Sequence, residues 1–167
     1  PIILYDYQTT RHSKHPKAFL KEFKGYLHVD GYDGYHALKD VELVGCWAHA
    51  RRNFDEALKS LPANVHKKST AAAEGLQFCN QLFQIERQIN DKIENCTPEQ
   101  RKEYRLEHSK PVLDAFLTWL KTKRPQVPPK SKLGDAITYC INQWSKLVVF
   151  LEDGRLELDN NRAERSI

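Results

Sequence analysis

The sequence lacks an apolar run that approaches the roughly 20 residues needed to cross a bilayer, so no membrane role is expected. It also lacks an initiating methionine, because it opens on Pro1 and contains no Met at all. No basic stretch followed by a small-residue cleavage site indicates a signal peptide. We therefore expect the chain to be the middle of a longer protein.

Cysteine is scarce, and the four cysteines are Cys46, Cys79, Cys96 and Cys140. They lie far apart, and three fall in helix-like segments, which argues against a disulfide framework. This usage predicts core residues in a reducing cytoplasm. The basic surplus is small, since 26 Lys and Arg face 22 Asp and Glu. A formal charge of +4 is compatible with a nucleic-acid partner without requiring one.

Strand and helix signals alternate over the first third of the chain. Short apolar, β-prone runs predict strands at 2–5, 26–29 and 41–47. A helix is expected from Pro16 to the C-cap Gly25, with Phe19 and Phe23 on its buried side, and a short helix or turn at 32–38. This alternation predicts an α/β fold in which helices cover a sheet with parallel pairs.

From Ala48 onward the apolar period becomes helical. Helices are predicted at 48–61, 69–95, 98–124 and 131–151. Thr97 and Gln100 have the spacing of a capping box, and Pro111 is expected to kink or divide the helix that they begin. Residues 62–151 are therefore expected to form an all-helical insertion.

Asp30 follows the second predicted strand, where ligands of α/β sheets gather. Its carboxylate suits Mg²⁺, which prefers hard oxygen ligands. Asp30-Gly31 is also an ordinary turn signal, so the aspartate has a purely structural interpretation as well. The same two interpretations apply to Asp6, after the first predicted strand.

Glu164 falls in the first turn of a helix that Asn161 can cap. Enzymes that transfer phosphoryl groups on nucleic acid commonly use carboxylates to hold two divalent ions, which makes Glu164 a second candidate ligand. Asn161 and Glu164 also have the spacing of a capping box, in which the glutamate only bonds back to the cap. The spacing alone favours the structural interpretation.

Cys46 and His49 have the C-x-x-H spacing of half a zinc site. No second close pair of Cys or His completes four ligands, so a buried cysteine and a polar histidine at the strand exit are favoured. The helix that follows is basic, with Arg51, Arg52, Lys59, Lys67 and Lys68. Such a run binds phosphates or forms a solvated face, and the solvated face is the commoner case.

Three blocks of this sequence resemble the DDE transposase family of bacterial insertion sequence 66. The blocks are GYLHVDGYDGY at 25–35, GCWAHARR at 45–52 and LDNNRAER at 158–165, and the resemblance covers essentially the whole chain. It implies an RNase H-like (retroviral integrase-like) core that lacks its first strands. The core is expected at 1–61, the helical insertion at 62–151 and the return to the core at 152–167.

The resemblance also implies functional residues. Asp30 corresponds to the second catalytic Asp and Glu164 to the catalytic Glu, both ligands of two Mg²⁺ (or Mn²⁺) ions in the intact enzyme. The first catalytic Asp is expected upstream of Pro1, and Asp6 does not match it. The fragment alone is therefore expected to bind metal poorly and to cut DNA slowly or not at all.

The C-x-x-H signature implies a position near the active site rather than a zinc site. DNA contacts are expected from a set of five residues: Trp47, which stacks on a base, and His49, Arg51, Arg52 and Arg165. The implied activity is metal-dependent strand cleavage and strand transfer during transposition. Its partners are the transposon ends, the target DNA and further copies of the chain, in the nucleoid of a bacterial cytoplasm.

Two rival interpretations remain open. A non-catalytic DNA-binding or oligomerisation module would use the helical insertion for protein contacts and the acidic residues only for caps and turns. A cellular nuclease of the same fold is a third interpretation, which the three blocks disfavour. Because a sheet that begins at Ile2 exposes a strand edge, we also expect dimerisation through that edge or partial instability.

Overall fold

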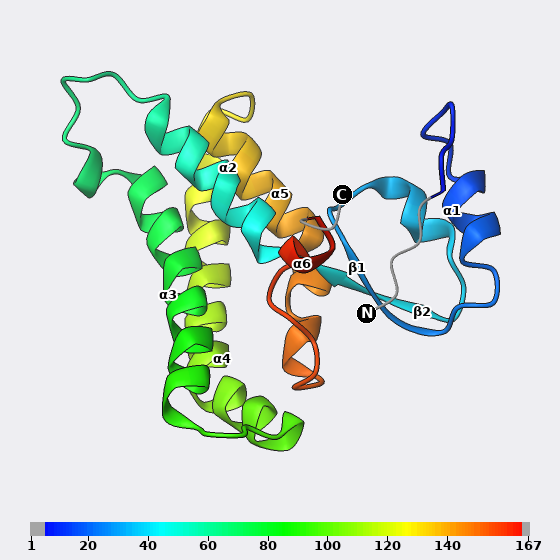
Figure 1. Cartoon of the computed structure of the whole chain (residues 1–167). Helices are drawn as coiled ribbons and strands as arrows, with labels where there is room; N and C mark the ends of the chain where they lie inside the picture. The colour runs from blue at the N-terminus through cyan, green and yellow to red at the C-terminus, as the bar shows by residue number, and fades with distance from the viewer. Residues whose placement is uncertain (1–5, 165–167) are drawn as a thin grey trace.

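A computed structural model describes residues 6–164 of the chain. The predicted strand at 2–5 and the predicted DNA contact Arg165 lie outside the described residues. Within them, a small parallel sheet stands at one end of a set of long helices, so the α/β class is confirmed (Figure 1). Helices dominate this α/β chain, and the described sheet has two strands.

The sheet consists of β1 (Gly25–Val29) and β2 (Val41–Gly45), joined through a short 3-10 helix, η1 (Asp33–Ala37). The strands pair in parallel, with Val29 opposite Gly45 at their C-terminal ends. Both strands were predicted. The prediction ran the second of them two residues too far, because Cys46 is already the N-cap of a helix and Trp47 its first residue.

The first helix differs from the prediction. Helix α1 (Lys14–Phe19) starts earlier than Pro16, ends well before Gly25 and buries none of its residues. Phe19 is 51% exposed and Phe23 38% exposed, so the expected buried side is wrong. Leu20 is the C-cap of α1, and Gly25, whose φ of +110° favours glycine, serves the start of β1 instead of a helix end.

The later helices follow the predicted segments closely. They are α2 (Trp47–Lys59), α3 (Ala71–Lys92), α4 (Pro98–Lys123), α5 (Lys132–Leu147) and the short α6 (Asn161–Glu164), with 3-10 turns η2 (Lys67–Ser69), η3 (Arg124–Gln126) and η4 (Val149–Leu151). Thr97 and Gln100 form the predicted capping box. Pro111 does not divide α4, because Leu113, Phe116 and Leu120 continue the same buried face beyond it.

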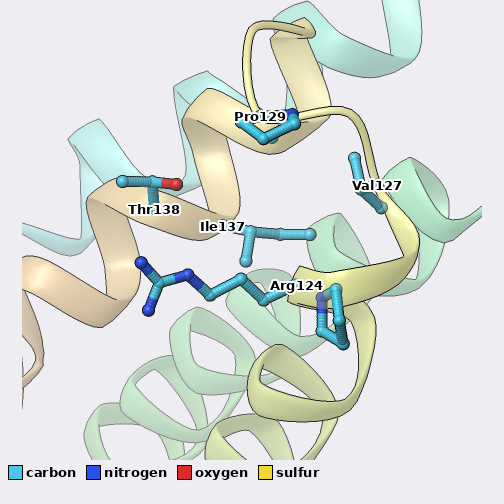
Figure 2. A pocket seen from close by; sticks show the side chains of 7 residues that line it. Arg124, Val127, Pro129, Ile137 and Thr138 are labelled. Atoms are coloured by element: carbon cyan, nitrogen blue, oxygen red, sulfur yellow. The ribbon is translucent and has the colours of Figure 1, made fainter.

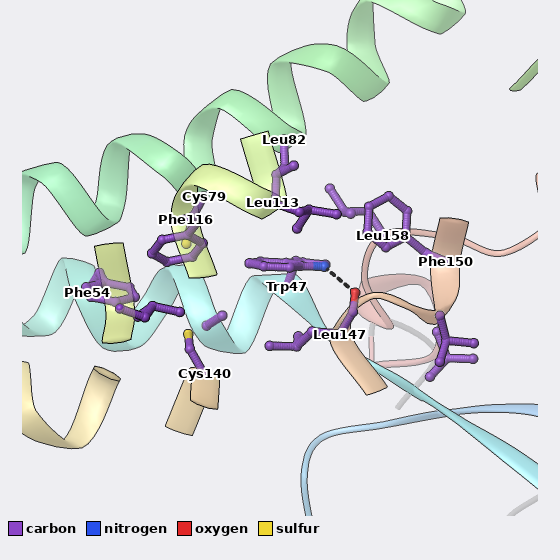
Figure 3. Packing of buried hydrophobic residues seen from close by; sticks show 14 of the residues in the cluster. Trp47, Phe54, Cys79, Leu82, Leu113, Phe116, Cys140, Leu147, Phe150 and Leu158 are labelled. Carbon is purple, nitrogen blue, oxygen red and sulfur yellow. Dashed lines mark hydrogen bonds between the residues drawn. The ribbon is translucent and has the colours of Figure 1, made fainter. Parts of the chain in front are cut away.

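Helix α2 packs against α3 and α5, and α3 packs against α4 (Figure 1). The side chains between them form one hydrophobic cluster around Trp47 (Figure 3). Trp47 is fully buried, and its indole Nε1 donates to the Leu147 carbonyl oxygen at 2.8 Å. The expected stacking of Trp47 on a DNA base is therefore wrong, since the ring is enclosed by Phe116, Trp144 and other core residues.

The hydrophobic cluster crosses the predicted domain boundaries. It joins Val44 and Phe54 from the segment 1–61, Phe116 and Ile137 from 62–151, and Leu158 from 152–167. Helix α5 also contacts β2 directly. The division into a core and an insertion stays a prediction, and the three segments share this packing.

The cysteines largely behave as predicted. Cys46, Cys79 and Cys140 are buried, and Cys96 is partly exposed, all as free thiols. Burial raises the pKa of Cys79 to about 12 and raises the pKa of Cys140 as well, so both thiols stay protonated at neutral pH. Buried neutral thiols of this kind act as small apolar core residues.

Candidate functional site

The ends of the two strands bring the first and second sequence blocks together. Since β1 and β2 are parallel and Val29 lies opposite Gly45, the residues that follow them, Asp30 and Cys46, leave the sheet at the same edge. Cys46 is the N-cap of α2, which places His49 in the first turn of that helix. The C-terminal edge of the sheet and the start of α2 therefore form one region.

Glu164 reaches this region from the far end of the chain. Its Oε1 lies 3.0 Å from Nε2 of His49, across 115 residues of sequence. The His49 side chain is 20% exposed and that of Glu164 39% exposed, so the pair lies at the surface with part of each side chain covered. The structure thus unites two residues that the sequence placed in separate blocks.

The contact rejects the capping-box interpretation of Glu164. The backbone N–H of Asn161, which that interpretation assigns to Glu164, donates instead to Oδ1 of Asp159 at 3.0 Å. The Asn161 side chain donates to the other carboxylate oxygen of Asp159 at 2.8 Å. Asp159 therefore fixes the start of α6, and the Glu164 carboxylate contacts His49.

Two hydrogen bonds dock the segment before α6 onto the start of α2. The backbone N–H of Trp47 donates to the Leu158 carbonyl oxygen at 3.1 Å. The backbone N–H of Asn160 donates to Sγ of Cys46 at 3.5 Å. Burial raises the pKa of the Cys46 thiol, which disfavours the thiolate that zinc would need. In the C-x-x-H pattern, the cysteine thus docks the returning segment and the histidine contacts its glutamate.

Asp30 is exposed and makes the turn that its sequence predicts. Its Oδ1 accepts the backbone N–H of Tyr32 at 3.0 Å, while its carbonyl oxygen accepts the hydroxyl of Tyr139 at 3.4 Å. Gly31 has a φ of +97°, and a Cβ there would lie 3.3 Å from the Tyr139 ring. Helix α5 thus packs closely on this turn, which uses one oxygen of the Asp30 carboxylate.

The predicted DNA-binding arginines have different surroundings. Arg51 and Arg52 are both exposed on α2, one turn beyond the His49 region. Nε of Arg51 donates to Oδ1 of Asn80 at 2.6 Å, so its guanidinium is partly committed to α3. Further along α2, Lys59 pairs with Asp55 at 2.6 Å.

Asp6 is exposed and accepts a hydrogen bond from the side chain of Gln8 at 2.9 Å, which fits its structural interpretation. Among residues 6–164, no group of three or more His, Cys, Asp or Glu side chains is placed to hold a metal ion.

Sequence reasoning missed Arg105, whose side chain is fully buried in α4. A signal was present, because Arg105 continues the buried helical face formed by Ser109, Leu113 and Phe116. A charged residue on such a face is rarely buried without partners. The partners, which lie far away in the sequence, had no detectable pattern.

A pocket at the turn between α4 and α5 lies among other residues. Its volume is about 340 Å³, and its lining is Arg124, Pro125, Val127, Pro129, Gly134, Ile137 and Thr138 (Figure 2). None of these is a predicted site residue. The residues of interest instead gather at the exposed ends of β1, β2 and α6.

The sequence profile of the Transposase IS66 family matches residues 1–167. The chain belongs to this transposase family. It is 32% identical over 181 residues to the uncharacterized protein y4hP of Sinorhizobium fredii, covering 100% of this chain and 32% of that protein. A second S. fredii relative, the uncharacterized protein y4qI, is 29% identical over 177 residues, again covering 100% of this chain and 31% of that protein.

The chain of this IS66 transposase family member thus spans about a third of the length of the curated relatives it matches. No solved structure matches it. In the described part of this family member, every helix is too short or too polar to span a membrane.

Proposed function

We propose that this chain carries part of the catalytic centre of a DDE-type transposase, which cleaves DNA strands and joins them to target DNA during transposition. Membership of the transposase family supports the reaction class. The contact between His49 and Glu164 is the observation that carries the assignment. It brings the third sequence block to the strand ends where Asp30 and the second block lie.

We further propose that β1 and β2 belong to an RNase H-like sheet. Two features support this fold: the parallel pairing of the strands and the position of Asp30 just after β1. Ligands of α/β sheets gather at this edge. The strand that would carry another aspartate is expected in the part of the protein before Pro1.

The donor chemistry of the site fits Mg²⁺ or Mn²⁺. Asp30 and Glu164 are exposed carboxylates, and such hard oxygen ligands are preferred by these ions. Each carboxylate has one oxygen engaged within the described residues, Asp30 with the N–H of Tyr32 and Glu164 with His49. The other oxygen of each carboxylate is the proposed metal ligand. Asp30 and Glu164 would hold these ions together with a further carboxylate, and the bound ions would supply activation of the attacking oxygen and stabilisation of the leaving one.

His49 orients the Glu164 carboxylate in this proposal. The Nε2–H of His49 donates to Oε1 of Glu164, with 3.0 Å between the two atoms, and Oε2 of Glu164 is then the ligand oxygen. The Cys46 side chain supports the same geometry, since its thiol accepts the backbone N–H of Asn160 just before α6. The C-x-x-H pattern therefore positions the catalytic glutamate.

Exposed arginines on α2 neutralise DNA phosphates near the site. Arg52 is exposed, and Arg51 keeps part of its guanidinium accessible beside Asn80. Each phosphate that a cationic side chain neutralises releases counterions, which strengthens binding at low salt. The transposon ends and the target DNA are the proposed partners, with further copies of the protein in the active complex.

Strand-transfer assays with the full-length transposase test this function. Glu164→Gln and Asp30→Asn remove a ligand charge with little change in volume, and each should abolish strand cleavage and strand transfer on donor-end DNA. Glu157→Gln is the matched control, because Glu157 lies in the same segment but pairs with Arg162 at 3.3 Å on the surface. It should keep normal activity.

The opposite result would favour the rival function. If Glu164→Gln kept strand transfer, Glu164 would serve only its contact with His49 and Asp30 only the turn after β1. The chain would then act as a non-catalytic DNA-binding or oligomerisation module. DNA affinity measured on the same variant separates the two functions, because a ligand-charge change should impair chemistry far more than binding.

A further inference from the structure

Arg105 is a fully buried arginine in the N-terminal half of α4, far in sequence from the blocks at 25–35, 45–52 and 158–165. Its Nε and Nη2 donate to the two carboxylate oxygens of Glu86, on α3, at 2.7 and 2.9 Å. This bidentate geometry is available to arginine and not to lysine. One side of the guanidinium is thus paired across the α3–α4 interface.

The other side of the same guanidinium binds backbone carbonyls of the turn after α5. Nη1 donates to the carbonyl oxygens of Phe150 at 2.9 Å and Asp153 at 3.3 Å, and Nη2 donates to that of Leu156 at 2.8 Å. Gly154 in this turn is so close to α4 that a Cβ would lie 1.8 Å from the Pro98 carbonyl oxygen. Arg105 therefore joins three carbonyl groups of turn 150–156 to α4, beside the apolar packing of Phe150 and Leu156.

Turn 150–156 leads directly to the proposed catalytic glutamate. Two residues after Leu156, the Leu158 carbonyl accepts the Trp47 N–H, and Asn160 then bonds to Cys46. Glu164 follows and contacts His49. The guanidinium of Arg105 thus sets the starting point of the segment that carries Glu164 to the site.

We propose that Arg105 is a positioning residue for the catalytic centre: its bonds to turn 150–156 place α6 so that Glu164 meets His49. This inference rests on the proposed function for its catalytic consequence. Its structural part, the placement of the segment 156–164 by Arg105, is independent of that function.

The bonding pattern separates this role from simple stabilisation. A buried ion pair is often no better for stability than apolar residues of the same volume, because removing both charges from water costs as much as their attraction returns. The effect of Arg105 that apolar residues cannot replace is geometric, since its guanidinium joins three carbonyl groups of one turn to α3 and α4. Loss of this link should therefore act on the segment 156–164 first.

Arg101 provides a matched control on the same helix. It lies one turn before Arg105 and contacts the same carboxylate, with Nη1 3.3 Å from Oε2 of Glu86. Its Nη2 donates to Asn90 at 2.9 Å rather than to turn 150–156. Arg101→Lys thus disturbs the same ion-pair cluster without touching the turn.

Hydrogen exchange in the full-length transposase measures the structural part. The Trp47 amide is the reporter, because a first-turn N–H has no acceptor within its own helix and depends on the Leu158 carbonyl. Arg105→Lys should speed exchange of this amide and that of Asn160 about tenfold or more, the scale of losing bonds to a charged donor. The exchange rates of mid-helix amides in α3 and α4 should be unchanged in Arg105→Lys. In Arg101→Lys, the exchange rates of these amides and of Trp47 and Asn160 should all be unchanged.

The catalytic part is measured by strand cleavage at varied Mn²⁺ concentration. A displaced Glu164 should lower the cleavage rate about 100-fold, as small misplacements of catalytic groups do. It should also raise the Mn²⁺ concentration that gives half-maximal rate, which a residue with only a stabilising role would not change. Arg101→Lys should match the wild-type protein in both readouts.

The double variant Arg105→Met/Glu86→Leu covers the case in which Arg105→Lys weakens the whole fold. It replaces the buried guanidinium and the carboxylate that pairs with it by apolar groups, so no buried charge is left unpaired. Arg101 loses Glu86 in this variant, but its side chain is 24% exposed and keeps its bond to Asn90. The local loss of protection at Trp47 and Asn160 should persist in it. Unchanged protection at these two amides, or an equal rise throughout α3 and α4 in both variants, would overturn the proposal.

Glu164→Gln assayed in parallel distinguishes failure of this inference from failure of the proposed function. If Glu164→Gln is active, Arg105 has no catalytic role through Glu164, and hydrogen exchange alone tests whether Arg105 places the segment 156–164. An inactive Glu164→Gln together with a fully active Arg105→Lys would refute the positioning role and keep the proposed function.

Discussion

Substitution of Trp47 by phenylalanine should destabilise the fold rather than act on DNA binding. The indole is fully buried, and its N–H is the partner of the Leu147 carbonyl at 2.8 Å. Phenylalanine leaves that carbonyl without its donor, at a cost of about 1–3 kcal/mol. The lost ring atoms leave a cavity that costs about 1 kcal/mol more. Trp47→Phe should therefore lower the free energy of unfolding by about 2–4 kcal/mol.

Urea unfolding followed by circular dichroism measures this loss, and Trp119→Phe is the control. The Trp119 indole also donates a hydrogen bond, to Glu74 at 2.7 Å, but that carboxylate is 46% exposed and water can replace the donor. Its loss should cost at most about 1 kcal/mol from the bond itself. A Trp47→Phe protein of unchanged stability with weaker DNA binding would refute the buried role and restore the base-stacking interpretation.

Three further outcomes are expected. Bonds from Arg155 lower the pKa of Asp153 to about 2. The Asp153 carboxylate therefore stabilises the fold fully above the ordinary pKa of aspartate, and this stabilisation is lost as the pH falls toward 2. In urea unfolding, Asp153→Asn should lower the free energy of unfolding at pH 6 and leave it nearly unchanged near pH 2. Thiol labelling of the native protein should modify Cys96 first and Cys79 only on unfolding, because Cys79 is buried. Arg52→Ala should weaken DNA binding for all sequences and reduce the slope of log affinity against log salt by about 1.

Local signals in this chain were strong enough to predict most of its helices. The capping box of Thr97 and Gln100 depends on residues three apart, and it forms as the spacing indicates. The long helices were predictable because their apolar residues repeat with the helical period, and these apolar faces pack against one another in the core. Helix α1 shows the limit: its apolar positions fit a longer helix, but Gly25 serves the strand that follows.

The candidate site depended on contacts between distant residues, which periodicity does not encode. Spacing alone favoured a cap role for Glu164, whereas its carboxylate lies against His49, 115 residues away. The family resemblance implied that Trp47 stacks on a base, yet it is the first residue of a helix whose start is covered by Leu147 and Leu158. The partners of Arg105 lie on α3 and in the turn after α5, which folds back on α4, so no local pattern indicates them.

Metal specificity in the full-length transposase tests the central claim, that Glu164 is a ligand of the catalytic ions. A thiolate at that position binds softer ions better than Mg²⁺, which requires hard oxygen ligands. We predict that Glu164→Cys loses strand cleavage in Mg²⁺ and regains part of it in Mn²⁺ or Cd²⁺, while Glu157→Cys stays active in Mg²⁺. Wild-type rates of Glu164→Cys in Mg²⁺ would contradict the assignment.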